Sequence, residues 1–269
     1  MTAVLGREVR SELVRTRRRG VLLGWLGLTA LLTVLVNSVM FGVVAESPTS
    51  AGQGPGVAFP TLAQLAAPDG LTAGVAAAAS MLGLVTLAYW AVLTATDHST
   101  GVLRLLVSAQ PRRWRLVAGK ALALSTWTGA AAALAVASNV AVAPVAARAA
   151  GIGTAAWGAA GPGDVAQAWL RLYACLLVWG ALGLMLATVS RSAAVDVSVG
   201  AGWVLLVEGI VGAALDGLAR WMPGATLTAL AQGGTADTSM VVAVVTGAAY
   251  SLLALGLAAA VLTRRDVVD

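Results

Sequence analysis

The sequence predicts an all-α integral membrane protein with six transmembrane helices, and three observations carry this prediction. Of the 269 residues, 59% are hydrophobic and 11% are charged, whereas soluble domains carry about 25% charged residues. Uncharged runs of about 20 residues, enough to cross a bilayer core of about 30 Å, recur along the chain. Lys and Arg are distributed unevenly between the segments that connect these runs.

The six runs are predicted to form a single transmembrane domain over residues 1–269, without an internal repeat or a soluble domain. The fifth run carries Asp196 and Glu208 and is the weakest candidate, because charged side chains are costly inside a bilayer. We expect the first run to be retained, because it is longer than the signal-peptide core of about 7–15 residues. The third run is expected to bend at Pro144. The predicted spans are residues 21–44, 71–96, 121–147, 172–190, 193–215 and 238–263.

The basic residues predict the orientation of the spans. Only Arg148, Arg171 and Arg220 lie in the connecting segments of one side. Because basic segments are retained in the cytoplasm, the other side is predicted to be cytoplasmic, with both termini on it. Omitting the fifth span would mix the basic residues of the two sides, so their distribution also supports this span. The other side holds 14 of the 17 Lys and Arg residues: Arg7, Arg10, Arg15, Arg17, Arg18, Arg19, Arg104, Arg112, Arg113, Arg115, Lys120, Arg191, Arg264 and Arg265.

Residues 3–19 are predicted to form an amphipathic interfacial helix on the cytoplasmic side. Leu5, Val9 and Leu13 recur every four residues, and arginines occupy the remaining faces. The arginines could also serve only to set topology, and the two interpretations are compatible. In the first span, Gly20 and Gly24 are four residues apart and could let helices approach closely, although the signal is weak in a chain with 31 glycines.

Residues 97–120 form the most informative segment between two spans. We expect Ser99 or Thr100 to cap a short helix that runs to about Ser108, and Pro111 to stop it. A second short run, 112–120, then leads into the third span. The residues alone leave two interpretations open: an ordered basic hairpin, or a loop that only sets topology.

The segments predicted on the outer side differ in composition. Residues 46–70 hold four prolines, and residues 148–164 are rich in Ala and Gly, so both are predicted to be loops. Residues 216–237 include Leu218, Trp221 and Leu227, which is too apolar for a free loop. We expect this segment to lie in the outer interface or to re-enter the membrane.

Residues 97–120 resemble the cytoplasmic loop of ABC transporter permeases of the type-two exporter class, and most closely the permease subunits associated with multicopper-enzyme maturation. The family pattern is an acidic residue, Thr-Gly, a basic residue, a short apolar helix, Pro-Arg-Arg and a Lys that opens the next span. This family more often has Glu in place of Asp97, and an aromatic residue in place of His98. The resemblance continues in residues 187–193, 220–225 and 264–267, and so covers nearly the whole chain. The matching residues are Asp97, Thr100, Gly101, Arg104, Pro111, Arg112, Arg113 and Lys120.

The resemblance implies a half-transporter in the cytoplasmic membrane of a bacterium. Two such permease subunits would pair, as a homodimer, and each would rest on a separate ATP-binding subunit that carries ATP and Mg. The chain itself would hold no cofactor and would not bind nucleic acid. Residues 3–19 would flank the coupling helix, and residues 216–231 would be outer re-entrant helices. The residues implied to couple to the ATPase are Asp97, His98, Thr100, Gly101, Arg104, Leu105, Pro111, Arg112 and Arg113.

The sequence lacks the motifs of common catalytic sites. Gly119-Lys120 is followed by Ala121, and the position that a phosphate-binding loop needs as Gly is Trp114. The single histidine and the single cysteine, Cys175, are far apart, so no metal-ligand cluster is predicted. We therefore expect the chain not to be an enzyme. The alternatives are an accessory membrane protein without a transport pathway and, less favoured, an intramembrane enzyme.

Glu208 is the candidate pathway or gate residue, because it is an uncompensated carboxylate within an apolar span. An equally weighted interpretation is that the helix meets a wet outer vestibule at this point. The apolar spans are consistent with a lipophilic drug, a lipid or a small peptide as the substrate.

Overall fold

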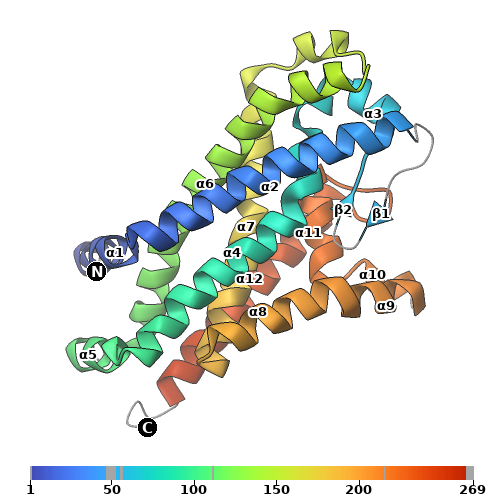
Figure 1. Ribbon diagram of the computed structural model, residues 1–269. Coiled ribbons are helices and arrows are strands. Elements are labelled where there is room, and N and C mark those ends of the chain that lie inside the picture. Colours follow the sequence, from blue (N-terminus) through green and yellow to red (C-terminus); the bar gives the residue numbers. More distant parts are fainter. Residues whose placement is uncertain (1, 47–52, 55–56, 111, 215, 265–269) are drawn as a thin grey trace.

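The computed structural model describes residues 2–46, 53–54, 57–110, 112–214 and 216–264. They form an elongated helical bundle with both ends of the chain toward the same end of the molecule (Figure 1). Five of its helices are long and apolar enough to cross a membrane, which indicates a multi-pass membrane protein. They confirm the first four predicted spans and the sixth as long apolar helices: α2 (Arg19–Glu46), α4 (Ala73–Ser99, extended by the 3-10 turn η1, Pro68–Thr72), α6 (Arg113–Ala149), α7 (Pro162–Ser190) and α12 (Met240–Arg264).

The fifth predicted span is helical but divided. It consists of α8 (Ala193–Gly202), the π-helical segment η3 (Trp203–Val207) and α9 (Glu208–Ala214), followed by α10 (Asp216–Ala219). Neither α8 nor α9 has the length of a span, so a sixth crossing stays a prediction. Asp196, Gly200 and Val204 are buried, so one stripe of this segment faces the bundle. The apolar residues exposed between them are Val197, Val199 and Trp203.

Helices α4 and α7 form the centre of the bundle and pack most closely on one another. An added Cβ at Gly83 of α4 would overlap the indole of Trp179, and one at Gly180 of α7 would lie 2.5 Å from the ring of Trp90. Each helix therefore accommodates a tryptophan of the other above a glycine. Small residues allow this close approach, which dispersion forces stabilise in a membrane where the hydrophobic effect does not.

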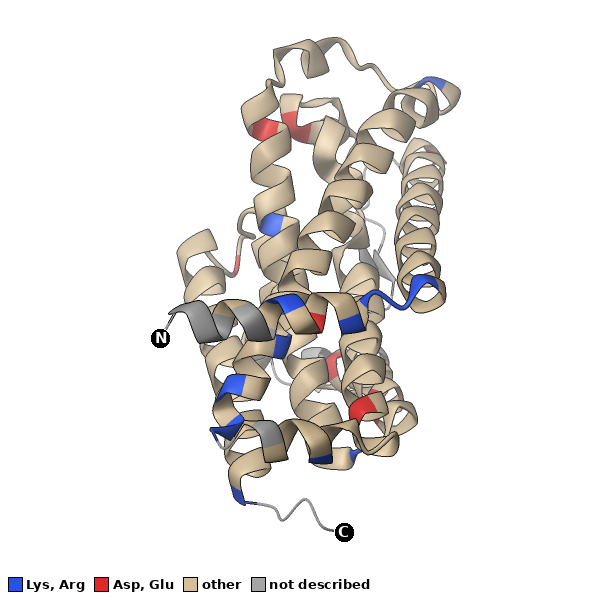
Figure 2. Cartoon of the chain, turned by 90° about the vertical axis from the view of Figure 1, so that its left-hand side faces the viewer, with Lys and Arg blue, Asp and Glu red and all other residues tan. Residues whose placement is uncertain are grey.

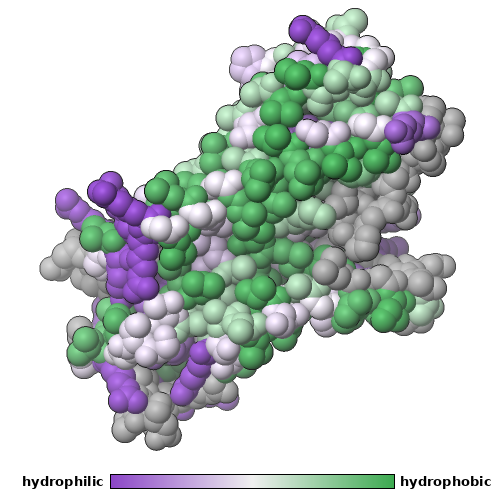
Figure 3. Space-filling model, in the orientation of Figure 1, coloured by the Kyte–Doolittle hydropathy of each residue, from purple (hydrophilic) through white to green (hydrophobic). Residues whose placement is uncertain are grey.

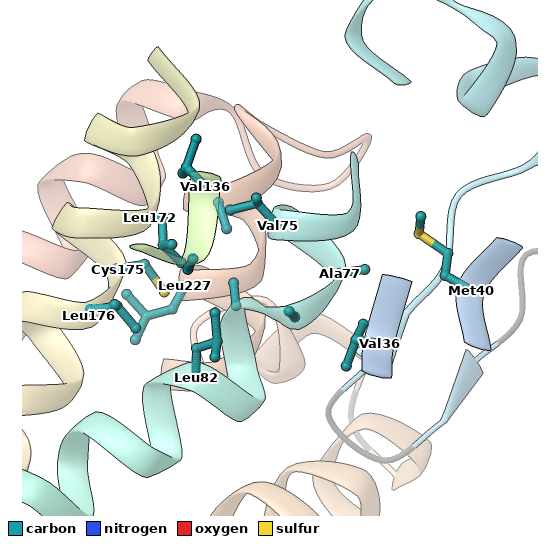
Figure 4. Close-up of a cluster of buried hydrophobic side chains, with 14 of the residues drawn as sticks. Val36, Met40, Val75, Ala77, Leu82, Val136, Leu172, Cys175, Leu176 and Leu227 are labelled. Carbon is teal, nitrogen blue, oxygen red and sulfur yellow. The ribbon is translucent and has the colours of Figure 1, made fainter. Parts of the chain in front are cut away.

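A cluster of buried apolar side chains joins the central pair to its neighbours (Figure 4). Met40 comes from α2, Leu82 from α4, Leu172 and Leu176 from α7, and Leu227 from α11 (Pro223–Gln232). Helix α11 thus lies within the bundle and packs on α4, α7 and α12. The segment 216–237, predicted to be interfacial or re-entrant, contains this buried helix.

Polar side chains also connect the helices. Asn37 Nδ2 of α2 donates to Asn139 Oδ1 of α6 at 2.8 Å, and Asn139 Nδ2 donates to the carbonyl of Leu71 at 2.7 Å. Both asparagines are fully buried. Because burying these amide N–H groups without acceptors would be costly in this environment, the pair favours one register between α2, α6 and η1. Asn37 Oδ1 has no hydrogen-bond partner among the described residues.

The end of the bundle opposite the termini is closed by short elements. They are the antiparallel pair β1 (Gln53–Gly54) and β2 (Val57–Ala58), α3 (Leu62–Ala66), and the 3-10 turn η2 (Ala155–Ala159). Trp157 Nε1 donates to the carbonyl of Leu65 at 2.8 Å, which joins the two segments predicted to be loops. The prediction of plain loops is therefore wrong in its detail, while residues 47–52 and 55–56 lie outside the described residues.

Charge and hydropathy divide the surface along the length of the bundle. Lys and Arg gather toward the end that carries the termini (Figure 2). On the face shown in Figure 3, hydrophobic residues cover α2 and α4 between this end and a smaller hydrophilic group at the opposite end. The distribution agrees with the predicted basic asymmetry.

Candidate functional site

Helix α1 (Thr2–Thr16) lies at the basic end and packs on α6. Trp127 Nε1 of α6 donates to Thr16 Oγ1 at 3.1 Å. Val9 and Leu13 are half-buried, whereas Val14 is 74% exposed. The helix predicted over 3–19 therefore ends at Thr16, and the side chain of Leu5 lies outside the described part of the structure.

A network of charged side chains connects α1, α4 and α6. Asp97, in the last turn of α4, forms ion pairs with Lys120 of α6 and, at 3.0 Å, with Arg15 of α1. Arg15 also pairs with Glu12 on its own helix. Lys120 is only 7% exposed, and its Nζ also donates to the carbonyl of Leu93 at 2.9 Å. Asp97 therefore holds two cations from two different helices.

Glu12 is the most buried acid of this network. Burial raises the pKa of its carboxyl group above the ordinary value, while Lys120 and Arg15 nearby lower it. One of its oxygens, Oε2, is buried without a hydrogen-bond partner among the described residues. The network is thus asymmetric, since Asp97 is well paired and Glu12 is only partly so.

Beside the network lies a cavity of about 40 Å³, which is large enough for water molecules. His98 and Asp97 of α4 line it together with Leu103 and Leu106 of α5 (Val102–Ala109). Its walls thus combine charged and apolar groups. His98 therefore faces inward, between α5 and the bundle.

The turn between α4 and α5 differs from its prediction. The hydroxyl groups of Ser99 and Thr100 both donate back to the carbonyl of Thr96, at 3.2 and 2.7 Å, and so bond to α4. Neither caps α5, whose N-cap position is Gly101 in the left-handed conformation with φ +70°. The predicted Ser/Thr cap is therefore wrong: the hydroxyl groups satisfy the end of the preceding helix, and glycine permits the sharp reversal.

Helix α5 has an apolar side that faces the bundle and an opposite side that is exposed on the protein surface. Leu103 and Leu106 line the cavity, whereas Leu105 is 71% exposed and Arg104 is also exposed. The predicted helix is thus present, with bounds close to those expected. Its outward surface is centred on Leu105.

The remaining predicted coupling residues follow α5. Arg112 is exposed and precedes α6. Arg113 donates to the carbonyl of Leu262 at 2.9 Å, near the C-terminal end of α12, where a cation complements the helix dipole. Pro111 lies outside the described residues.

Glu208 lies far along the chain from these residues, at the start of α9. Its Oε1 accepts a hydrogen bond from the backbone N–H of Gly224 at 2.8 Å, in the first turn of α11. An added Cβ at Gly224 would overlap the carboxylate. Glu208 therefore caps a helix that has no side-chain cap of its own, because Met222 occupies the N-cap position.

Sequence reasoning identified Asp97 but missed Glu12 and Arg15 as its neighbours. The i, i+3 spacing of Glu12 and Arg15 on a helix was the available signal. Nothing in the sequence indicated that this helix would lie against Asp97. Within the described ranges, no group of His, Cys, Asp or Glu residues could hold a metal ion.

Comparison with protein-family models and with curated proteins finds no match to the chain.

Proposed function

We propose that the chain is the membrane-spanning permease subunit of an ATP-driven exporter, which pairs with a second permease subunit and docks on separate ATP-binding subunits in the cytoplasmic membrane. The resemblance of residues 97–120 to type-two exporter permeases motivates the proposal. The observation that carries it is the ion-pair network at Asp97, which ties the base of α5 to α1 and α6.

The network supports a mechanical role for α5. The short helix joins the end of α4 to the beginning of α6, and the Asp97–Lys120 pair links those two helices directly. A force applied to α5 would therefore act on two long helices together, rather than bend a free loop. Coupling between a motor and a pathway needs this kind of rigid connection.

The outward side of α5 would provide the contact with the ATPase. Leu105 is an exposed apolar side chain on a short helix, and Arg104 and Arg112 are exposed beside it. A central apolar anchor with surrounding charges is the usual composition of a small interface. Val102 and Leu106 contribute less to this surface, because both are partly buried.

The test is Leu105→Asp, with the candidate ATPase co-expressed and co-purified. Leu105 is exposed, so the variant is expected to insert and fold normally, while co-purification and substrate-stimulated ATP hydrolysis fall at least about tenfold, as expected for an interface anchor. The matched control is Leu218→Asp, because Leu218 is also exposed but lies on α10, in the segment predicted to be outer.

Normal co-purification and normal coupled hydrolysis in Leu105→Asp would reject the coupling assignment. An equal loss in both variants would indicate a general effect of the new charge. If the chain is instead an accessory protein without a pathway, no ATP-binding subunit should co-purify with the natural chain or with the variants.

A further inference from the structure

A large cavity lies near the short elements that close the end of the bundle opposite the termini. It has a volume of about 480 Å³, within the range of small-molecule sites, and it is separate from the network around Asp97. Its walls come from α3 and the segment before it, from η1, α4 and α7, and from the end of α11 and the residues after it. The only charged side chains in its lining are Arg171 of α7 and Asp69 of η1.

Arg171 is held in a specific orientation at this cavity. An added Cβ at Gly233 would lie 2.5, 2.6 and 2.8 Å from Nη1, Cζ and Nη2 of the guanidinium group. These nearly equal distances show that the group lies flat against the backbone at Gly233, which itself has φ +82°. A guanidinium stacked by its face keeps its N–H edges available in the plane.

Those N–H groups lack protein acceptors in the described residues. Arg171 forms no ion pair there, and its Nε is buried without a hydrogen-bond partner. Arg171 is the tenth residue of α7, about 13 Å from its first residue, so it lies near the boundary of the apolar core. An arginine at such a depth normally faces water, a counter-charge or a ligand.

The rest of the lining can add donors to the site. Gln64 uses its Oε1 to accept from Thr61 N at 2.8 Å, so its amide nitrogen remains a donor. Gln232 contributes a second amide. Asp69 is exposed, where water screens its charge. The lining therefore suits one negative group better than several.

We propose that this cavity binds an oxyanion, a carboxylate or phosphate group, on the guanidinium edge of Arg171. Such a group accepts two parallel N–H bonds from arginine, and a ligand of this size also fills the apolar part of the cavity. The oxyanion could belong to the headgroup of an anionic lipid or to a soluble molecule. The site does not depend on the proposed ATPase partner, so it can be tested on the full chain alone.

The experiment measures the thermal unfolding of the full chain in neutral detergent by tryptophan fluorescence. Glycerol 3-phosphate and butyrate are the soluble probes, and dihexanoylphosphatidylglycerol is the lipid probe. Glycerol and dihexanoylglycerol, which lack an oxyanion, are the controls. We expect a saturable rise in Tm with at least one oxyanion probe and none with the controls.

Two variants with opposite expected effects make the test specific. Arg171→Gln should raise the apparent Kd at least about tenfold, because the charged fork is lost. Asp69→Asn should lower the apparent Kd about twofold, because a like charge is removed at an exposed position. Each shift is measured against the baseline of its own variant, since Arg171→Gln also removes the stacking on Gly233.

The outcomes separate the sources of the ligand. Binding of the lipid probe alone assigns a headgroup, and binding of a soluble probe assigns a free oxyanion. The proposal is overturned if no oxyanion probe raises Tm, or if Arg171→Gln binds as tightly as the natural chain. Arg171 would then serve only to support the C-terminal end of α11.

Discussion

Several buried polar side chains in this bundle join different helices, whereas the buried threonines mostly bond to a carbonyl of their own helix. Asp97 meets Lys120 and Arg15, and Asn37 meets Asn139. In apolar surroundings a lone polar group has no water to bond with, so its partner decides whether burial is tolerated. The ion pairs of Asp97 with Lys120 and Arg15 therefore set the geometry at the base of α5.

Asp97→Asn should destabilise the protein by about 3–5 kcal/mol, because it leaves the buried Lys120 ammonium without its ion-pair partner. Titration of denaturing detergent into mixed micelles measures the free energy of unfolding. The double variant Asp97→Leu/Lys120→Met should recover most of the loss, because it removes both charges together.

Asp164→Asn is the control for that change. Asp164 is an exposed acid that accepts from Gly161 N at 2.8 Å, so its loss should cost about 1 kcal/mol or less. If Asp97→Asn costs no more than Asp164→Asn, the network does not hold the helices together.

Pairs of helices meet where a large side chain faces a small one. Gly83 and Gly180 each receive a tryptophan from the opposite helix. The pair that the sequence suggested, Gly20 and Gly24, has no described atom within 4 Å of an added Cβ at either position. Within the described chain, therefore, no helix approaches closely at those two glycines.

Gly83→Ala should cost about 1–3 kcal/mol, because the new methyl group would overlap the indole of Trp179. Gly27→Ala is the matched control, since an added Cβ there meets no described atom within 4 Å and alanine is the better helix former. Unfolding of both variants in the same micelles checks the prediction. Equal stability of the two would mean that α4 and α7 do not pack as described.

Glu208 acts on the element that it caps. Glu208→Ala should lower the free energy of unfolding by about 0.5–2 kcal/mol, because α11 loses its only side-chain acceptor at Gly224 N in the described structure. Glu208→Gln keeps an oxygen at this position and should lose less. The expected order of decreasing stability is the natural chain, then Glu208→Gln, then Glu208→Ala. If Glu208→Gln were less stable than Glu208→Ala, the capping role would be excluded.

A pathway role for Glu208 makes a separate prediction. Glu208→Gln should then reduce transport at normal expression, because the charge is removed while the cap is largely kept. Transport and expression are measured separately. Normal transport at normal expression would leave Glu208 with the capping role alone.

At the scale of the whole molecule, the number of membrane crossings depends on residues 193–214. In a Cys175→Ala background, Ser108→Cys and Arg191→Cys should be protected from a membrane-impermeant maleimide in intact cells, whereas Ala63→Cys and Leu218→Cys should react. All four positions are exposed on the protein. These results would show that α4 and the divided fifth segment each cross the membrane. Together with crossings by the other long helices, α2, α6, α7 and α12, that gives six crossings and cytoplasmic termini.

Two results would contradict that topology. External labelling at position 108 would show that the orientation is the opposite of the one predicted. Labelling at position 218 only after permeabilisation would mean that the divided fifth segment does not cross, which leaves the five long helices.

The sequence by itself determined the long apolar helices, the basic end and the short helix between Gly101 and Pro111. These features are local: they follow from the length of an uncharged run, from the position of arginines, and from one glycine with a permissive backbone and one proline with a restricted backbone. The residues of α5 could therefore be predicted, although their capping could not, since Ser99 and Thr100 had a competing acceptor on α4.

Only the tertiary structure decided which residues meet. Asp97 lies 23 positions from Lys120 and 82 from Arg15, and hydropathy could not connect them. In a membrane protein both the lipid-facing and the core-facing sides of a helix are apolar, so periodicity does not show which side is buried. The facing glycines and tryptophans of α4 and α7, the cap that Glu208 gives to α11 and the orientation of Arg171 all depend on that choice of side, which packing alone makes.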